Sequence, residues 1–167
     1  VPMKIKEEDI KFTQRSSVQE IEEGTSFSPK FNADGLLPCI TVEHETNQIL
    51  MFSYLTEEAL KKSISLKLAH YYSRSRNNIW LKGEVSGMKH FIEDIFIDDD
   101  QDSIIYVVRL NEPSKGGKKA SCHVGYKSCF YRKIKVKEKS IELEFTEKEK
   151  SFNPDIIYEG IANPTKL

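Results

Sequence analysis

Residues 36–54, LLPCITVEHETNQILMFSY, contain the clearest structural pattern in the chain. Two apolar, partly β-branched runs, Leu36–Val42 and Gln48–Tyr54, flank the polar tetrapeptide His44–Asn47. Residues of these types favour strands, and a short polar segment between two such runs favours a turn. The stretch therefore predicts a β-hairpin from which the rest of a sheet extends.

A short helix is predicted directly after this hairpin. Thr56 is suited to cap a helix, and the two glutamates that follow it suit the positive end of a helix dipole. Apolar residues then recur at helical spacing as far as Ile64. We expect one helix over about residues 56–66.

Further apolar segments predict strands joined by turns that are rich in Asn, Gly and Asp. The segment Ser103–Leu110 is apolar without clean alternation, which predicts a strand buried on both faces. The fold class is therefore α+β and β-rich, with a mostly antiparallel sheet. The strands are expected at His70–Ser73, Ile79–Lys82, His90–Ile97 and Ser103–Leu110, followed by a closing hairpin of Phe130–Val136 and Ser140–Phe145.

The composition limits the class of protein. At 167 residues the chain fits one ordinary domain, and its formal net charge of -1 gives no overall attraction to nucleic acid or to anionic membranes. No run approaches the roughly 18 apolar residues of a membrane-spanning helix, and the N-terminus is charged where a signal peptide would be apolar. We expect a cytoplasmic protein without nucleic-acid or membrane partners.

An acidic cluster separates two of the predicted strands. Asp98, Asp99, Asp100 and Asp102 place four carboxylates within five residues. Such like charges repel one another unless cations neutralise them, and hard oxygen ligands suit Mg²⁺. The alternative is a solvated acidic turn, because Asp is a common turn former.

Two of the three cysteines, Cys122 and Cys129, lie close together around Gly125. Thiolates are the ligands that zinc prefers, and a glycine allows the backbone to fold so that both sulfurs converge on one ion. Two thiolates alone leave a tetrahedral ion short of ligands, so the alternative is a pair of buried cysteines beside a surface His123. Cys39 lies in an apolar strand and is interpreted as a core residue.

A basic segment, Ser73–Arg76, precedes the sequence WLKGEVSG at residues 80–87. Guanidinium groups, an ammonium group and small hydroxyl and glycine residues suit a phosphate pocket, and Trp80 suits stacking on a base. The alternative is a basic hairpin with a core tryptophan.

Across Phe31–Lys133, and in this order, these segments resemble the phosphoribosyl-AMP cyclohydrolase family. Each matching block is modest on its own, but four blocks occur in the family's order. The blocks are Asp34-Gly35-Leu36-Leu37-Pro38, the Ser73–Arg76 segment with Trp80-x-Lys82-Gly83-Glu84-x-Ser86-Gly87, Asp98-x-Asp100-x-Asp102, and Cys122-His123-x-Gly125-x-x-Ser128-Cys129-Phe130-Tyr131-Arg132.

The resemblance implies hydrolysis of the bond between N1 and C6 of the adenine ring in phosphoribosyl-AMP, a reaction of histidine biosynthesis. Family enzymes work as homodimers with Zn²⁺ in a shared site and Mg²⁺ as a second requirement. A ring carbon of adenine is a poor electrophile, so the attacking water needs a metal that lowers its pKa. A small nucleotide substrate, a second copy of the chain and both metals are therefore expected.

The resemblance also assigns residues of this chain to roles. Cys122 and Cys129 are expected to hold zinc, and His123 is expected to move the proton. The expected magnesium ligands are Asp98, Asp100 and Asp102. The expected substrate contacts are Arg74, Arg76, Trp80, Lys82, Glu84, Ser86 and Arg132. The basic residues among them are chosen for their charge.

One position departs from the family pattern. The family motif is Asp-Cys-Asp-x-Asp. Its Cys is the third zinc ligand and is supplied by the other chain of the dimer. This chain has Asp99 at the position of that Cys. Three alternatives are open for this site: Asp99 is a zinc ligand, zinc is not bound, or a harder metal such as Mn²⁺ or Fe²⁺ replaces zinc. The departure also leaves two alternatives to the family activity: a paralogue that hydrolyses another purine-like nucleotide, or a non-catalytic dimer that binds metal or nucleotide.

The resemblance suggests three parts of the chain. Residues 1–30 are expected to form an N-terminal extension, and residues 31–133 a cyclohydrolase-like domain. Residues 134–167 are expected to form a closing hairpin and a tail.

Overall fold

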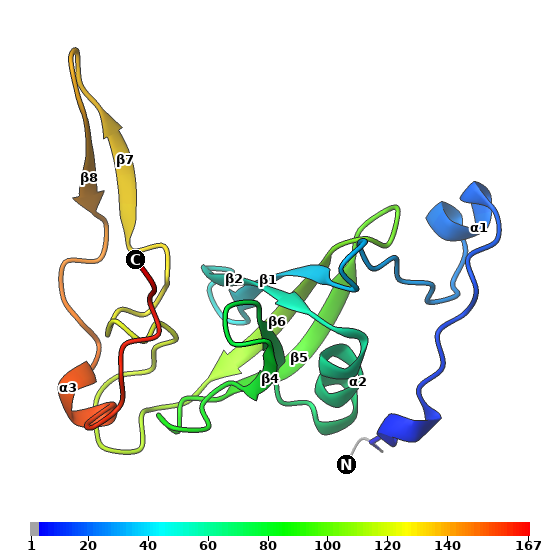
Figure 1. Cartoon of the computed structure of the whole chain (residues 1–167), viewed down its shortest axis with the longest axis horizontal. Coiled ribbons are helices and arrows are strands. Elements are labelled where there is room, and N and C mark those ends of the chain that lie inside the picture. The colour runs from blue at the N-terminus through cyan, green and yellow to red at the C-terminus, as the bar shows by residue number, and fades with distance from the viewer. Residues whose placement is uncertain (1–3) are drawn as a thin grey trace.

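A six-stranded sheet lies at the centre of the computed structural model, which describes residues 4–167 (Figure 1). The strand order is β4-β3-β2-β1-β6-β5, and β7 and β8 form a second sheet. The strands are β1 (Leu37–Glu43), β2 (Ile49–Leu55), β3 (His70–Ser73), β4 (Asn78–Leu81), β5 (His90–Ile97), β6 (Ile104–Leu110), β7 (Arg132–Val136) and β8 (Ile141–Phe145). The helical elements are η1 (Glu7–Asp9), α1 (Val18–Glu23), α2 (Glu57–Leu66) and α3 (Pro154–Ile157).

The predicted hairpin and central helix are confirmed. β1 and β2 pair antiparallel, with Leu37 opposite Leu55. α2 begins after Thr56, whose hydroxyl accepts a hydrogen bond from the Ala59 amide at 3.1 Å. Neighbouring strands pair antiparallel except for β1 and β6, which run parallel. The prediction of a mostly antiparallel, β-rich α+β fold is therefore confirmed.

The prediction of a single helix was incomplete, because α1 and α3 are also helical. The Ser17 side chain accepts a hydrogen bond from the Glu20 amide at the start of α1, and Asn153 caps α3 in the same manner through the Asp155 amide. These helices have six and four residues, too few for apolar periodicity to indicate them. Within residues 4–167, no helix is long and apolar enough to cross a membrane.

The prediction that the β6 segment is buried on both faces was wrong. Alternate residues from Ile104 to Leu110 are buried, whereas Ile105 and Val107 are half-buried and Arg109 is exposed. β-branched residues favour strands whichever face they occupy, so their apolar character alone did not indicate burial.

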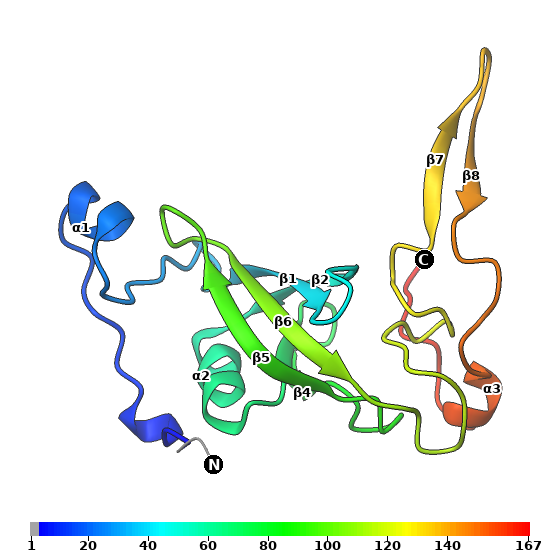
Figure 2. The same cartoon turned by 180° about the vertical axis from the view of Figure 1, so that it is seen from behind.

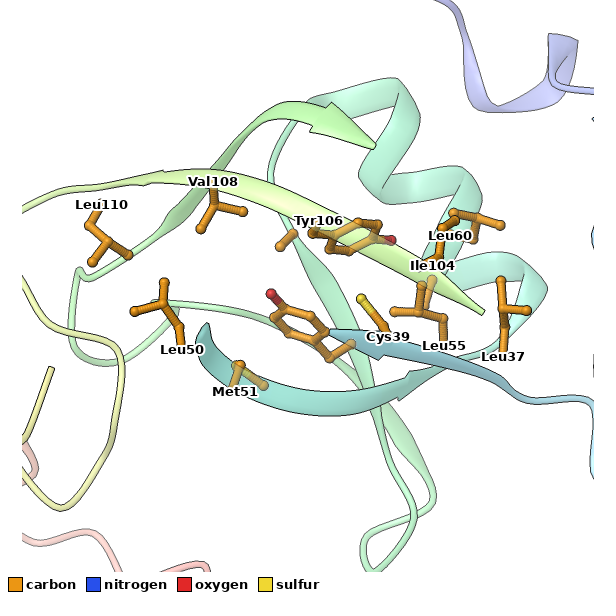
Figure 3. Packing of buried hydrophobic residues seen from close by; sticks show 13 residues of the cluster. Leu37, Cys39, Leu50, Met51, Leu55, Leu60, Ile104, Tyr106, Val108 and Leu110 are labelled. Atoms are coloured by element: carbon orange, nitrogen blue, oxygen red, sulfur yellow. The ribbon is translucent and has the colours of Figure 1, made fainter. Parts of the chain in front are cut away.

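The core of the molecule gathers residues of α2 and of the strands beside it (Figure 3). Tyr71 and Tyr106 are fully buried there, with ring centroids 5.9 Å apart. Cys39 lies in the same core, as expected, and burial raises the pKa of its thiol to about 12. The large aliphatic members of the core are Leu37, Leu50, Leu55, Leu60, Ile104, Val108 and Leu110.

The parallel pairing of β1 with β6 gives the sheet two distinct ends. Both strands start at the end that carries the acidic turn, residues 98–102, and finish at the end that carries the cysteine loop, residues 121–129. At the latter end the Cys129 amide donates to the Leu50 carbonyl at 2.7 Å. Figure 1, and Figure 2 from behind, show the β5–β6 turn on the side of α1 and the β7–β8 hairpin on the opposite side.

The C-terminal segment packs against the cysteine loop. Phe152 and Ile157 are buried in a small cluster with Met88 and Ala120. The Ser151 amide donates to a carbonyl of the loop, that of Gly125, at 2.7 Å. The expected division of the chain into an extension, a domain and a tail stays a prediction.

An ion pair also joins the cysteine loop to the end of β1. Lys127 Nζ lies 2.6 Å from Glu43 Oε1, and Glu43 is buried. Burial alone would raise the pKa of Glu43, but hydrogen bonds from Lys127 and Thr46 outweigh it and lower the pKa below 4.5. The stabilisation is therefore present above pH 4.5 and is lost as pH falls through the lowered pKa.

Replacing Lys127 by methionine should lower the unfolding free energy by about 1–3 kcal/mol, because the buried carboxylate loses its charged partner. Denaturant titrations at pH 7 test this, and adding Glu43→Gln to Lys127→Met should recover part of the loss. The difference between wild type and Lys127→Met should shrink as the pH is lowered below 4.5. A difference that does not change with pH would contradict the assignment.

Candidate functional site

A cavity of about 1250 Å³ lies where β3 and β4 meet the cysteine loop. Ligand pockets commonly have volumes of about 300–1,000 Å³, so this cavity is large enough for a nucleotide. Most of the residues that the sequence predicted as substrate contacts line it, together with two other predicted site residues, which belong to the cysteine loop. These residues are Arg74, Arg76, Trp80, Lys82, Glu84, Ser86, His123 and Cys129.

Arg74 and Arg76 are exposed in the turn between β3 and β4. The Arg74 guanidinium carbon lies 4.3 Å from the centre of the Tyr54 ring, and Arg76 Nε donates to Ser73 Oγ at 3.4 Å. Neither guanidinium forms an ion pair within residues 4–167. Both charges are therefore available to an anionic ligand.

The other substrate candidates differ in exposure. Trp80 is half-buried, and its ring packs against Tyr71 with centroids 5.2 Å apart. Glu84 is exposed, whereas Ser86 is buried and its hydroxyl accepts a hydrogen bond from the Met88 amide at 3.1 Å. An aromatic ring, a carboxylate and a hydroxyl thus adjoin the same cavity.

Lys82 is buried, and its ammonium group is bound to the chain itself. Lys82 Nζ donates to the Ser121 carbonyl at 2.6 Å. Burial lowers the pKa of Lys82, while the nearby Cys129 and Cys122 thiols act in the opposite direction. The ammonium group therefore adds positive charge beside the two cysteines.

The sulfurs of Cys122 and Cys129 interact with each other. The hydrogen bond from the Cys129 thiol is the main reason that the pKa of Cys122 falls to about 7, and the same interaction raises the pKa of Cys129. Gly125 lies between them with φ +114, and a Cβ there would meet the Phe152 carbonyl at 3.0 Å. The loop thus brings the two thiols close together, whereas their binding of zinc stays a prediction.

His123 is half-buried at the cavity, and its Nε2 is buried without a hydrogen-bond partner within residues 4–167. Burial lowers the pKa of His123, and the adjacent Asn163 side chain partly offsets this. Asn163 belongs to residues 158–164, which also line the cavity. The sequence offered no signal for this contribution, because the tail is charged or irregular and lies outside the recognised motifs.

The acidic turn brings three carboxylates together. Oxygens of Asp98, Asp100 and Asp102 lie within 4.8 Å of one another. The hydrogen bond with the Asp100 carboxyl is the main reason that the pKa of Asp102 rises to about 6. Asp99 is exposed beside them, and its Oδ1 accepts a hydrogen bond from the Asp100 amide at 3.0 Å.

The N-terminal extension supports the acidic turn through Gln101, a residue that no sequence motif indicated. Gln101 is buried with φ 59, and its Oε1 accepts a hydrogen bond from the Ser28 amide at 2.7 Å. Its Nε2 donates to the Ile21 carbonyl at 3.1 Å. Arg15 also donates to the Asp100 carbonyl at 2.9 Å. These contacts fix the backbone that carries the carboxylates.

The acidic turn and the cysteine loop do not meet within one chain. Asp98 and Asp99 line a second cavity of about 390 Å³, which includes residues of α1 and shares none with the first. Arg132 also lies outside the first cavity, because it belongs to β7, where its guanidinium carbon is 5.1 Å from the Tyr131 ring centre. The predicted metal ligands therefore form two separate groups.

Known proteins are similar to this chain over most of its length. A sequence model of the family described as phosphoribosyl-AMP cyclohydrolase matches residues 51–131. The phosphoribosyl-AMP cyclohydrolase of Bradyrhizobium diazoefficiens is 40% identical over 139 residues, which are 83% of this chain and 94% of that relative. The protein of the same name from Chlorobium limicola is 44% identical over 120 residues, 72% of this chain and 82% of the relative. The chain therefore belongs to the phosphoribosyl-AMP cyclohydrolase family, whose members are hydrolases that act on a cyclic amidine.

Proposed function

We propose that this chain hydrolyses phosphoribosyl-AMP in histidine biosynthesis and opens its adenine ring between N1 and C6. The observation that carries the proposal is the cavity of about 1250 Å³, which gathers basic and aromatic residues of one family motif with His123 and Cys129 of another. Membership of the family supports the same reaction.

The residues of the cavity would bind and orient the substrate. Arg74 and Arg76 would hold phosphate groups through charge-assisted hydrogen bonds. Trp80 would stack on the purine, and Glu84 and Ser86 would face polar groups of the ligand. Because Lys82 is buried and bound to the Ser121 carbonyl, its proposed role is to offset thiolate charge.

His123 is the proposed proton carrier. Burial lowers its pKa and keeps the imidazole neutral near pH 7, so it is able to accept a proton. It would take this proton from the attacking water and return it to N1 of the ring as the bond to C6 breaks. Nε2 of His123 is buried and has no hydrogen-bond partner among residues 4–167, which supports this role.

The donor groups fit the two metals of the family. The Cys122 pKa of about 7 makes a soft thiolate available beside Cys129 near neutral pH, which suits zinc. The clustered oxygens of Asp98, Asp100 and Asp102 are the hard ligands that Mg²⁺ prefers. When bound, zinc supplies a water of lowered pKa.

A second copy of the chain would complete the site. The acidic turn and the cysteine loop lie at opposite ends of β1 and β6, so each site would combine the turn of one chain with the loop of the other. Asp99 is exposed, and in this arrangement it would become the third ligand beside Cys122 and Cys129 of the partner. The proposed assembly is a homodimer.

Thorough chelation should abolish ring opening, and Mg²⁺ together with Zn²⁺ should restore it. The measurement follows ring opening of phosphoribosyl-AMP by ultraviolet absorbance on protein of known metal content. Asp100→Asn should raise the Mg²⁺ concentration needed for half-maximal activity by about tenfold or more, because a charged ligand is lost. Full activity of metal-free protein would refute the metal assignment. The second candidate function, suggested by Asp99 in place of the family's Cys, is that of a paralogue with another substrate. It would be favoured if the metal-loaded protein left phosphoribosyl-AMP intact but hydrolysed another purine nucleotide.

Substitution of Asp99 distinguishes a zinc ligand from an extra member of the magnesium cluster. If Asp99 is the third zinc ligand, Asp99→Cys should strengthen the preference for zinc, because thiolate is softer than carboxylate. Asp99→Asn should weaken zinc binding, because the anionic charge is lost while the volume is nearly kept. Zinc stoichiometry and Mg²⁺ dependence are measured on both variants and on wild type. Unchanged zinc content in Asp99→Asn would exclude the bridging role.

A further inference from the structure

Ser121, the residue before Cys122, is fixed through all three of its polar groups. Its amide donates to the Lys127 carbonyl at 2.9 Å, and its carbonyl accepts from Lys82 Nζ at 2.6 Å. Its hydroxyl lies 2.9 Å from His90 Nε2. Because Ser121 is only 2% exposed, water cannot easily replace these partners.

A buried chain of hydrogen bonds continues behind the Ser121 hydroxyl into the sheet. His90 Nδ1 lies 2.8 Å from the Tyr71 hydroxyl, which in turn lies 2.8 Å from Thr41 Oγ1. Thr41, Tyr71 and His90 are fully buried. A neutral imidazole offers one donor and one acceptor, so one consistent direction of donation satisfies every member from Thr41 to Ser121.

The two cysteines are anchored to different parts of the sheet. The Cys129 amide is bound to the Leu50 carbonyl of β2 at 2.7 Å. Cys122 is anchored instead through the preceding Ser121, which is bound by Lys82 and by His90, the first residue of β5. The distance between the two sulfurs therefore depends on both anchors.

We propose that His90 is a positioning residue, which holds Ser121 so that Cys122 and the adjacent His123 face the site. This inference rests on the proposed function, because it takes Cys122 and Cys129 as metal ligands. Loss of the bond between His90 and Ser121 should loosen the backbone before Cys122, which then keeps only the bonds of Ser121 to Lys127 and Lys82, while the anchor of Cys129 remains. Residues that orient metal ligands from outside commonly change metal affinity or activity by about 10–100-fold.

The test is a titration of full-length, metal-free protein with Cd²⁺, followed by the thiolate-to-metal absorption band. His90→Leu removes the bonds to both Tyr71 and Ser121, and it should weaken Cd²⁺ binding about tenfold. His90→Gln should restore binding to within about threefold of wild type, because the amide of Gln reaches the position of Nε2. Ser121→Ala should weaken binding as His90→Leu does, and the double variant should be no weaker than either single one.

Thr41→Val is the matched control, because it removes a hydrogen bond of the same buried chain without touching Ser121. It should lower the denaturant midpoint of the metal-free protein, as the His90 variants do, while Cd²⁺ affinity stays at the wild-type value. Wild-type Cd²⁺ affinity in His90→Leu or Ser121→Ala, or an equal loss in Thr41→Val, would overturn the proposal. If His90→Leu does not fold, Ser121→Ala and His90→Gln decide the question.

Activity measurements separate this inference from the proposed function. Ser121 adjoins the cavity, but its hydroxyl is bound to His90 and the proposed substrate contacts are other residues. With phosphoribosyl-AMP under saturating metal, Ser121→Ala should therefore lower kcat about tenfold and change KM little. If the wild-type protein does not hydrolyse phosphoribosyl-AMP, the proposed function fails, whereas the Cd²⁺ titrations still test the positioning role. A lowered kcat together with unchanged Cd²⁺ affinity would overturn the positioning of Cys122.

Discussion

The length of β6 is the constraint on which the proposed site depends. Its seven residues run from the acidic turn to the end of the sheet that carries the cysteine loop. At about 3.3 Å per residue, a strand of this length separates its ends by roughly 20 Å. β1 pairs with β6 in parallel, so both strands span the same distance. The acidic turn and the cysteine loop therefore cannot approach each other without breaking the core. Within one chain, the groups suited to magnesium and to zinc therefore stay apart.

Buried polar side chains hold the functional backbone at each end. Gln101 fixes the acidic turn against the N-terminal extension, and Ser121 fixes the cysteine loop against Lys82 and His90. A buried polar group is costly when it lacks a partner, so such networks favour one backbone arrangement over its neighbours. Apolar packing builds the sheet, whereas these hydrogen bonds set the positions of the candidate ligands.

Short sequence patterns predicted the elements of the fold that depend on residues close together in the sequence. The β1–β2 hairpin and the helix after Thr56 followed from apolar β-branched runs, turn residues and capping, and the thiols of Cys122 and Cys129 lie close together, as one of the two alternatives for the cysteines required. The burial of β6 was predicted wrongly because β-branched residues suit either face of a strand. Gln101, His90 and Ser121 were missed because their partners are distant in sequence and are chosen by tertiary structure.

The charge of a basic residue alone did not predict which groups its side chain contacts. Lys82, an expected substrate contact, lines the cavity, but it is buried and its ammonium group is bound to the Ser121 carbonyl. Arg132 was chosen for its charge, and it lies over the Tyr131 ring on the β7–β8 hairpin. Arg74 and Arg76 do adjoin the cavity, because the β3–β4 turn places them there. Their assignment to phosphates stays a prediction.

Subunit complementation tests most directly whether one site combines the acidic turn of one chain with the cysteine loop of another. A variant with Asp98, Asp100 and Asp102 all replaced by Asn, and a separate Cys122→Ser variant, should each be inactive alone, because every site of either homodimer lacks one part. After mixing and subunit exchange, half of the dimers carry one intact site of two, so activity should reach about a quarter of that of wild type. A mixture that exchanges subunits and remains inactive would contradict the shared site.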